Sequence, residues 1–550
     1  MQPFSYQHRT SIIDQCKTED FDMLIIGGGV TGAGIALDAA TRGLKVLLIE
    51  KNDFASGTSS KSTKLIHGGL RYLKQFDFWL VREVGTERAI VHKLAPHLVV
   101  PKKMLLPIIE NGTYSSWLTS IGLKIYDVLA NVEGDDKRQM LNKKEAIRTE
   151  PLLPESLVEG AGYYAEYRTD DARLTIEIIK TAVYHSAKAM NYCEAKSFIY
   201  NNKEITGAVA FDKITQHSFE INARYVINAT GPWVDNLREK TSLKETFKKR
   251  LQLTKGVHLV FPFEKFPVKQ SIYFDVPDGR MIFAVPRGKI TYVGTTDTNY
   301  QGDIDQIEVN LVDALYLISA VNHMFQDIDL NLDDVVSSWA GLRPLIQEEG
   351  KSVSELSRKD EIFESDSGLI SIAGGKLTGY RKMAERVTDL VCHKINKTYD
   401  KKTRTIQTEH LTLEGGSFKN YKAVQRYIQT VFEQIKNDGF DIKDIEILVH
   451  KFGQQTAAII QKFHELTDED VEIRMAKAEL WFCLNYEMTL TPLDFFTRRT
   501  GRLFFEIQSL HKLKMPILEV FREHFDWDQD TFDKHANEID LKIFKACHFE

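Results

Sequence analysis

The stretch DMLIIGGGVTGAGIALDAATRGLKVLLIE, residues 22–50, decides the fold of this chain. Its apolar runs at 23–26 and 46–49 predict two short buried strands with a helix between them. The glycines of the connecting turn follow the spacing GxGxxG, at Gly27, Gly29 and Gly32. The first allows a tight turn, and the second lets the backbone approach a diphosphate at the helix N-terminus. With Glu50 placed to bind ribose hydroxyls after the second strand, the stretch predicts a dinucleotide-binding unit.

Three later stretches predict further contacts with the same dinucleotide, although the glycines alone do not separate NAD from FAD. SGTSSKSTKLIHGGLRY, residues 56–72, offers small hydroxyl side chains soon after the acidic residue. NATGPW at 228–233 and AGGKLTGY at 373–380 each place a glycine turn after a strand-like run. Such repeated returns to one cofactor are typical of flavoproteins with a discontinuous FAD domain. The predicted cofactor contacts here are Thr58, Ser59, Ser60, Gly231, Gly374, Gly375 and Thr378.

Length and composition describe an ordinary globular chain of more than one domain. At 550 residues the chain is too long for one typical core, so two or three domains are expected. Hydrophobic residues make up 43% and the net charge is −6, so the chain lacks the basic footprint of a nucleic-acid-binding protein. The five cysteines are scattered without metal-ligand spacing, so we expect reduced thiols in a cytosolic compartment and no metal site.

The order of strand-like and helical patterns predicts an α/β protein with three parts. An FAD-dependent oxidoreductase region is expected over 20–400, with a discontinuous Rossmann-like FAD core over about 20–100, 150–240 and 335–400. Residues 241–334 carry short strand-like runs separated by turns such as PDG at 277–279, which predicts an antiparallel β substrate cap. Beyond residue 405, helical spacing of apolar residues predicts a C-terminal helical domain over 405–550, as at Val424, Ile428, Val431 and Ile435.

No stretch of the sequence predicts a membrane crossing. The first twenty residues lack the apolar core of a signal peptide, and no run of about eighteen apolar residues occurs. Residues 117–130 nevertheless predict a helix with an apolar side formed by Trp117, Ile121, Ile125 and Val128. This helix either packs on the protein itself or forms a lipid-facing or quinone-entry surface, and the sequence leaves both interpretations open.

A set of longer motifs resembles those of the FAD-dependent (aerobic) glycerol-3-phosphate dehydrogenases through nearly the whole chain. The set comprises SSKSTKLIHGGLRYL (59–73), DDARL (170–174), NATGPW (228–233), KGVHLVF (255–261), VGTTDT (293–298), GLRPL (341–345) and GGKLTGYRKMAE (374–385). The resemblance implies FAD as cofactor, sn-glycerol 3-phosphate as substrate, dihydroxyacetone phosphate as product and a membrane quinone as electron acceptor. It also implies a cytoplasmic protein with peripheral contact at the cytoplasmic membrane face.

The resemblance also assigns candidate residues to the reaction. Oxidation of a secondary alcohol by a flavin needs a base for the hydroxyl proton and a clamp for the rest of the substrate. The cations that map to the family's substrate pocket, and that suit a phosphate ester, are Arg71, Arg343, Arg358 and Lys376. His258 and His67 are the alternative bases, since a neutral imidazole accepts a proton near pH 7. Lys376 is also expected to stabilise the developing anion of the reduced flavin.

Other functions stay open at this point. A glycerol-3-phosphate oxidase would share the first half-reaction and use oxygen, releasing hydrogen peroxide, although the chain lacks the extra cap insertion expected of such oxidases. The cations at the pocket motifs disfavour an amine- or amino-acid-oxidising flavoprotein. A non-catalytic flavin-binding protein is disfavoured because the family's pocket residues are intact, at His258, Arg71, Arg343 and Lys376. The oligomeric state is also open, with a homodimer as the suggested assembly.

Overall fold

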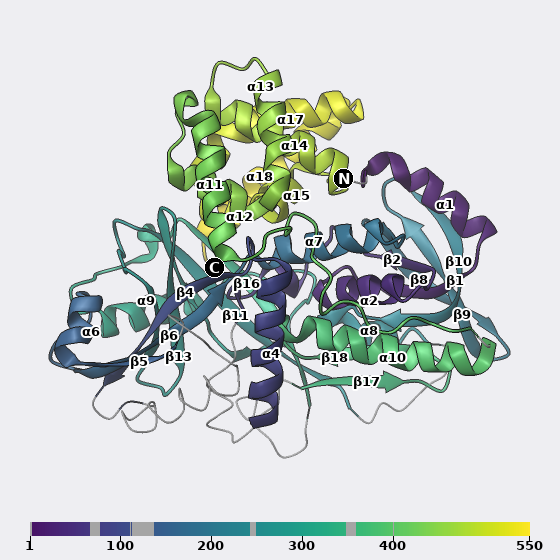
Figure 1. Cartoon of the computed structure of the whole chain (residues 1–550), viewed down its shortest axis with the longest axis horizontal. Helices are drawn as coiled ribbons and strands as arrows, with labels where there is room; N and C mark the ends of the chain where they lie inside the picture. The colour runs from purple at the N-terminus through teal and green to yellow at the C-terminus, as the bar shows by residue number, and fades with distance from the viewer. Residues whose placement is uncertain are drawn as a thin grey trace.

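Two β-sheets and a block of helices make up the computed structural model of the protein (Figure 1). The structure describes residues 3–66, 78–109, 112, 137–241, 249–347, 359–399 and 401–550. In Figure 1 the C-terminal helices, coloured green to yellow, stand above the two sheets, and the N-terminus lies beside them. The predicted fold class, an FAD-type α/β domain with an antiparallel cap and a helical C-terminal domain, is confirmed.

The first sheet is a parallel layer of the nucleotide-binding kind. β1 (Phe21–Ile26) pairs with β2 (Val46–Ile49) on one side and with β10 (His217–Asn228) on the other. On its other side β2 pairs with β7 (Lys188–Met190), and β10 pairs in the same way with β18 (Ile370–Gly374). Because parallel strands end at the same edge, the glycine turns that follow the first, tenth and eighteenth strands meet there. The strands predicted from the apolar runs before these turns are therefore confirmed.

Shorter strands widen this sheet at its edges. β17 (Asp360–Glu364) runs antiparallel to β18 on the outside. β8 (Cys193–Asn201) and β9 (Glu204–Asp212) form an antiparallel extension that pairs with β10. Helix α1 (Arg9–Thr18) buries Ile12 and Cys16 against this side of the molecule.

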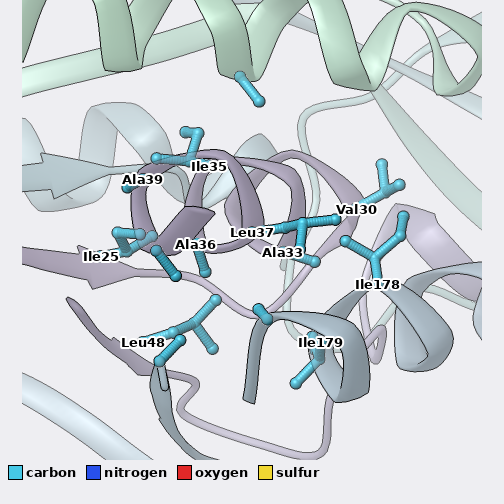
Figure 2. Packing of buried hydrophobic residues seen from close by; sticks show 14 of the residues in the cluster. Ile25, Val30, Ala33, Ile35, Ala36, Leu37, Ala39, Leu48, Ile178 and Ile179 are labelled. Atoms are coloured by element: carbon cyan, nitrogen blue, oxygen red, sulfur yellow. The ribbon is translucent and has the colours of Figure 1, made fainter. Parts of the chain in front are cut away.

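Helix α2 (Val30–Thr41) packs closely on the first sheet because its inner residues are small. Figure 2 shows Ala36 directed toward Leu48 of β2 and Ala33 toward Ile178 of the neighbouring helix α7 (Asp171–Tyr184). On another side, a Cβ at Gly34 would lie 2.9 Å from a ring carbon of Tyr380, the first residue of α10 (Tyr380–Tyr399). A larger residue at these positions would push the helices apart, since interiors are close-packed.

The second sheet contains the predicted cap strands as sequential antiparallel hairpins. β12 (Ser271–Asp275), β13 (Met281–Arg287) and β14 (Ile290–Gly294) pair in order, and β14 pairs with β11 (Leu251–Pro262). The turn between β12 and β13 falls at the predicted PDG sequence, and the turn between β13 and β14 includes Gly288 and Lys289. The antiparallel cap is therefore confirmed over these strands.

Strands from outside 241–334 complete the second sheet. β4 (Val100–Ile109) pairs with β12 and with β6 (Val158–Arg168), and β16 (Ser337–Ile346) pairs with β11 along its whole length. The remaining strands are β3 (Leu65–Ile66), β5 (Gln139–Asn142) and β15 (Thr298–Asn299). β6 and β16 fall within segments predicted as FAD core, but both strands pair in the second sheet. The strand composition of this sheet therefore differs from that prediction. The alternation of a strand identifies it as a strand, but its partner depends on residues far away in the chain. The domain limits themselves stay a prediction.

The C-terminal helical domain packs on the second sheet. Its longer helices are α11 (Tyr421–Ile435), α12 (Ile442–Phe452), α13 (Thr456–Glu465), α14 (Val471–Tyr486), α17 (Ile507–Phe525) and α18 (Gln529–Cys547). The predicted apolar side of α11 is buried, as the 3.6-residue repeat requires. Val260, Tyr292 and Trp339 of the sheet belong to the same apolar cluster as these helices. The two parts therefore share one core.

The described residues also include four helices around the sheets, α4 (Phe78–Leu94), α6 (Lys143–Thr149), α8 (Val234–Arg238) and α9 (Leu311–Met324). In the part of the chain that the structure describes, none of the helices has both the length and the apolar character needed to cross a bilayer. The predicted amphipathic helix at 117–130 lies outside the described residues.

Candidate active site

A cavity of about 980 Å³ is lined by residues of both sheets. Most of the predicted site residues that the structure describes line it, namely Gly27, Gly29, Glu50, Thr58, Ser59, Gly231, His258, Arg343, Gly374, Gly375, Lys376 and Thr378. These residues come from six separate stretches of the sequence, which the parallel sheet and the cap bring together. This volume lies near the upper end of the range for small-molecule and cofactor sites.

The glycine turn after β1 leaves no room for side chains. Gly27 has a φ of +118°, and a Cβ there would lie 2.5 Å from the carbonyl oxygen of Ala229. A Cβ at Gly32 would lie 1.9 Å from the carbonyl oxygen of Gly27, so this glycine packs the helix onto the turn and does not line the cavity. Gly29 is the N-cap of α2, whose first N–H groups lie at the cavity. The turn therefore has the shape and the polarity that bind a diphosphate.

Glu50, at the end of β2, is fixed by backbone hydrogen bonds. Its carboxylate accepts from the N–H of Gly28 at 2.7 Å and from the N–H of Asn52 at 3.0 Å. Burial raises the pKa of this carboxyl, and the two N–H donors act against that rise. A carboxylate oxygen can accept more than one hydrogen bond, so Glu50 retains capacity for a ribose hydroxyl.

The hydroxyl residues after β2 have different roles. Ser59 lines the cavity, and its Oγ accepts the N–H of Val30 at 2.9 Å, so it caps the first turn of α2. Thr58 donates its hydroxyl to the carbonyl of Leu342 at 2.7 Å and so ties this segment to β16. Ser60 is buried, and it is absent from the cavity wall. The prediction of a cofactor contact therefore has a geometric basis at Thr58 and Ser59 and lacks one at Ser60.

The turn after β10 and the turn after β18 complete this wall. Gly231, Gly374 and Gly375 have φ values of +59°, +81° and +80°, which side chains rarely adopt. Lys376 and Thr378 follow at the start of the turn that leads into α10, and both line the cavity. The cradle as a whole consists of glycine turns, helix N-termini and one acidic residue, which is the donor and acceptor set that a dinucleotide cofactor needs.

The opposite wall is the face of β11 and β16 that carries His258 and Arg343. His258 lies opposite Trp339 in the antiparallel pair, and Gly256 lies opposite Gly341. Since alternate residues share a face, these four positions and Arg343 lie on one side of the sheet. A Cβ at Gly256 would lie 2.7 Å from Nη2 of Arg343. The two glycines therefore let Arg343 and Thr295, and the backbone of Lys61, lie close against this face of the sheet.

His258 is held rigidly within this wall. Its ring stacks on Trp339 with a centroid distance of 4.7 Å and an interplanar angle of 10°. Its Nε2 lies 3.0 Å from Oγ1 of Thr63, while among the described residues its buried Nδ1 has no hydrogen-bond partner. Burial, together with the charges of Arg343 and Lys64, holds the pKa of His258 well below its usual value of 6.5. The ring is therefore neutral at physiological pH.

Arg343 has its guanidinium oriented by the loop after β14. It donates to the carboxylate of Asp297 at 2.9 Å, to the hydroxyl of Thr295 at 3.0 Å and to the carbonyl of Thr296 at 3.2 Å. The ion pair with Asp297 is partly exposed, at 21% and 19% of the two side chains. Water and salt therefore reach it, and an incoming anion could share the guanidinium.

Comparison with known proteins places this arrangement in a family. Residues 22–381 match the family model described as FAD dependent oxidoreductase, and residues 406–532 match the C-terminal domain of alpha-glycerophosphate oxidase. The aerobic glycerol-3-phosphate dehydrogenase of Bacillus subtilis (strain 168) is 46% identical over 546 residues, 99% of this chain and 98% of that protein. The chain belongs to the family of FAD-dependent glycerol-3-phosphate dehydrogenases.

Two further glycerol-3-phosphate dehydrogenases match over the whole length. The aerobic enzyme of Staphylococcus aureus (strain bovine RF122 / ET3-1) is 43% identical over 544 residues, 98% of this chain and 97% of that protein. The X-ray structure of the glycerol-3-phosphate dehydrogenase from Bacillus halodurans complexed with FAD is 41% identical, with a TM-score of 0.84 over 99% of this chain and 98% of that one. The resemblance found in the motifs is confirmed, and so is FAD as the cofactor of this glycerol-3-phosphate dehydrogenase.

Three predicted site residues of this glycerol-3-phosphate dehydrogenase, His67, Arg71 and Arg358, lie outside the described residues. Their roles stay predictions. The structure also places residues at the site that the sequence analysis missed. Thr63 and Asp297 lie within the motifs SSKSTKLIHGGLRYL and VGTTDT, so the motifs pointed to their neighbourhood but not to their partners.

Proposed function

We propose that this dehydrogenase oxidises sn-glycerol 3-phosphate to dihydroxyacetone phosphate in the part of the cavity lined by His258 and Arg343 and delivers the electrons to a membrane quinone. The observation that carries the proposal is that a neutral imidazole and a guanidinium, His258 and Arg343, line the same cavity from one face of the sheet. A glycerol phosphate has an alcohol and a phosphate a few bonds apart, so it can contact both groups at once.

FAD fits the opposite wall, where the glycine turns, Glu50, Ser59 and the N-terminus of α2 would hold its diphosphate and ribose. When bound, FAD supplies N5 as the acceptor of the hydride from C2 of the substrate. In our proposal Lys376, which precedes the turn that leads into α10, would stabilise negative charge on the reduced flavin ring. Thr378 follows on the same turn and adds polar groups to the same end.

In the proposed mechanism His258 removes the proton of the C2 hydroxyl. This role requires the tautomer in which Nε2–H donates to Thr63 Oγ1 and Nδ1 carries the lone pair. Nδ1 is the nitrogen left without a partner among the described residues, which supports this tautomer. Thr63 would then fix both the orientation of the ring and the nitrogen that carries the proton. In other catalytic histidines the hydrogen-bond partner of one ring nitrogen has the same effect. His67 stays the alternative base.

Arg343 is proposed to bind the substrate phosphate, together with Lys376 and the predicted Arg71 and Arg358. A phosphate near Arg343 would offset the positive charge that lowers the pKa of His258. The imidazole would then become a stronger base once the substrate is bound. The phosphate-binding cations would therefore serve both the binding of the substrate and the removal of its proton.

Quinone, and not oxygen, is the proposed electron acceptor, because the relatives with 43–46% identity are named dehydrogenases. Peripheral contact with the membrane, which we also propose, would give access to such a lipid-soluble acceptor. A homodimer stays the suggested assembly. The amphipathic sequence at 117–130 is the candidate for the membrane surface.

Anaerobic stopped-flow reduction of the yellow protein tests the proposal directly. Glycerol 3-phosphate should bleach the flavin absorbance, and the reduced protein should be reoxidised faster by a soluble quinone than by oxygen. Glycerol without the phosphate is the matched control, and it should bleach the flavin far more slowly. Rapid peroxide release with oxygen would instead establish the oxidase, and failure of any phosphate ester to bleach the flavin would refute the substrate.

A further inference from the structure

The loop that follows Glu50 contains a fully buried carboxylate whose function the mechanism does not explain. Asp53 has no exposed side-chain surface, and its oxygens accept from Nδ2 of Asn191 at 2.9 Å and from two arginines. The loop is closed onto the glycine turn, since the N–H of Ala55 donates to the carbonyl of Gly28 at 3.0 Å. Any shift of Asp53 would therefore move the segment that holds Glu50.

The two arginines that bind Asp53 come from the C-terminal helical domain. Nη1 of Arg499 donates to Oδ2 at 2.7 Å and Nη2 to Oδ1 at 2.9 Å, which is a bidentate pair. Nε of Arg498 donates to Oδ2 at 2.5 Å. Both lie on the π-helical turn η10 (Phe495–Arg499), closed by a hydrogen bond from the N–H of Thr500 to the carbonyl of Phe495. Such turns recur at functional sites, so this one warrants an explanation.

The same segment of the helical domain also contacts α7, the helix that lies beside α2. Glu487 accepts two hydrogen bonds from Arg173 of α7, at 2.6 and 2.8 Å, and one from Lys180 at 3.1 Å. Nη2 of Arg499 donates to the carbonyl of Glu487 at 2.9 Å and so joins the two groups of contacts. In Figure 1 the C-terminal domain stands directly over α7, and in Figure 2 α7 packs along α2. Residues 487–499 therefore contact both the loop after β2 and the neighbour of the diphosphate helix.

The ion pairs of Asp53 with its two arginines cannot be removed without leaving a buried charge. Burial opposes ionisation of Asp53, but Arg499 and Arg498 overcome it and lower the pKa of the carboxyl to about 2. Asp53 is therefore ionised at neutral pH, and it would be an uncompensated buried charge without its arginines. The loop could then relax only by moving Asp53 toward water, away from the geometry that positions Glu50.

We propose that the C-terminal helical domain is part of the FAD site, with Arg499 and Arg498 as positioning residues that hold the loop of Glu50 through Asp53. The proposal rests on FAD as the cofactor and on Glu50 as a cofactor contact. It is independent of the base, the phosphate clamp and the electron acceptor. The helical domain then contributes to how tightly the cofactor is held.

Cofactor affinity of purified full-length variants tests this assignment. Arg499→Lys keeps the charge and loses the fork, so the Kd and the release rate of FAD should rise roughly 10- to 100-fold, the range for groups that support a first contact. Arg502→Lys is the matched control, because Arg502 is buried in the same domain and pairs with Glu479 instead. It should lower thermal stability without changing the Kd of FAD. Unchanged FAD affinity and release in Arg499→Lys would overturn the proposal.

Two further variants cover a failure of Arg499→Lys to fold. Arg498→Lys keeps a positive charge beside Asp53 and Asp494 and leaves the fork of Arg499 intact, so it should weaken FAD binding less and still fold. In an Asp53→Asn background the arginine variants should weaken FAD binding little further, because the carboxylate that connects the arginines to the loop of Glu50 is gone. Independent, additive losses would contradict the coupling. A protein that binds FAD tightly but is not bleached by substrate would refute the proposed function and leave this proposal standing.

Discussion

At the scale of single residues, His258 illustrates how a fold sets chemistry. Its ring is stacked on Trp339, bonded to Thr63 and kept neutral by burial and by Arg343. The motif KGVHLVF was enough to single out this histidine, and GLRPL was enough for Arg343. Their partners could not be predicted, because Thr63 is 195 residues from His258 and Asp297 is 46 residues from Arg343. Contacts over such separations depend on how the strands pair.

The lowered pKa of His258 gives a prediction for the pH dependence. The base must be neutral, so kcat/KM should stay level from about pH 8 down through 6.5 and fall only at more acidic pH. His258→Ala should slow flavin reduction by roughly 10²–10⁴-fold, the usual contribution of a general base, while FAD stays bound. Single-turnover kinetics over this pH range check both points. An acidic limb at or above pH 6.5, or unchanged reduction in the variant, would remove His258 from the base role.

At the scale of elements, the pairing of β11 with β16 places His258 and Arg343 on one face of the sheet. Part of β11 could be predicted from its strand-like run, and so could the hairpins from β12 to β14, whose turn sequences lie between them, but β16 was not predicted as a strand. The addition of β6 and β16 to the same sheet could not be predicted, because alternation carries no information on the partner strand. The common face of His258 and Arg343 arises only from the register that sets Gly256 opposite Gly341.

Displacing Arg343 should affect substrate binding more than cofactor binding. In Gly256→Ala the new methyl group would collide with Arg343 Nη2 and Thr295 Oγ1. We expect weaker substrate binding by about 1–3 kcal/mol, the cost of overpacking, or a roughly 5- to 150-fold higher KM. Gly160→Ala is the control, since it crowds a strand of the same sheet away from the cavity wall. Steady-state kinetics with FAD content measured in parallel would decide, and equal KM values in the two variants would contradict the proposed role of Arg343 in substrate binding.

At the scale of the whole molecule, the helical domain and the FAD region share buried charges as well as an apolar core. Asp53, Arg173 and Glu487 are all buried where the two parts meet. The sequence predicted the helical domain from its periodicity, but its arginines looked like ordinary surface charges. A charge has no local pattern that marks it as buried, so the contact surface between these parts could be found only in the structure.

This shared interior predicts cooperative unfolding. Loss of helical circular dichroism and release of flavin should coincide in one thermal transition, because neither part can expose the buried ion pairs alone. Excess FAD should shift both signals together, by about 2.7 kcal/mol of added stability at a free concentration of 100 times its Kd. Differential scanning calorimetry with both optical signals provides the check. A helical transition well below flavin release would show that the domains unfold independently.

The pairing of Asp53 with Arg499 also sets an order on the biogenesis of the protein. The two residues are 446 positions apart, so at 5–20 residues per second the ribosome needs roughly 20 to 90 s to deliver the arginine after the aspartate. Throughout that interval the nascent glycine turn is present while its supporting segment is not. Tight cofactor capture is thus expected after chain release. Truncated translation products would then accumulate as colourless apoprotein.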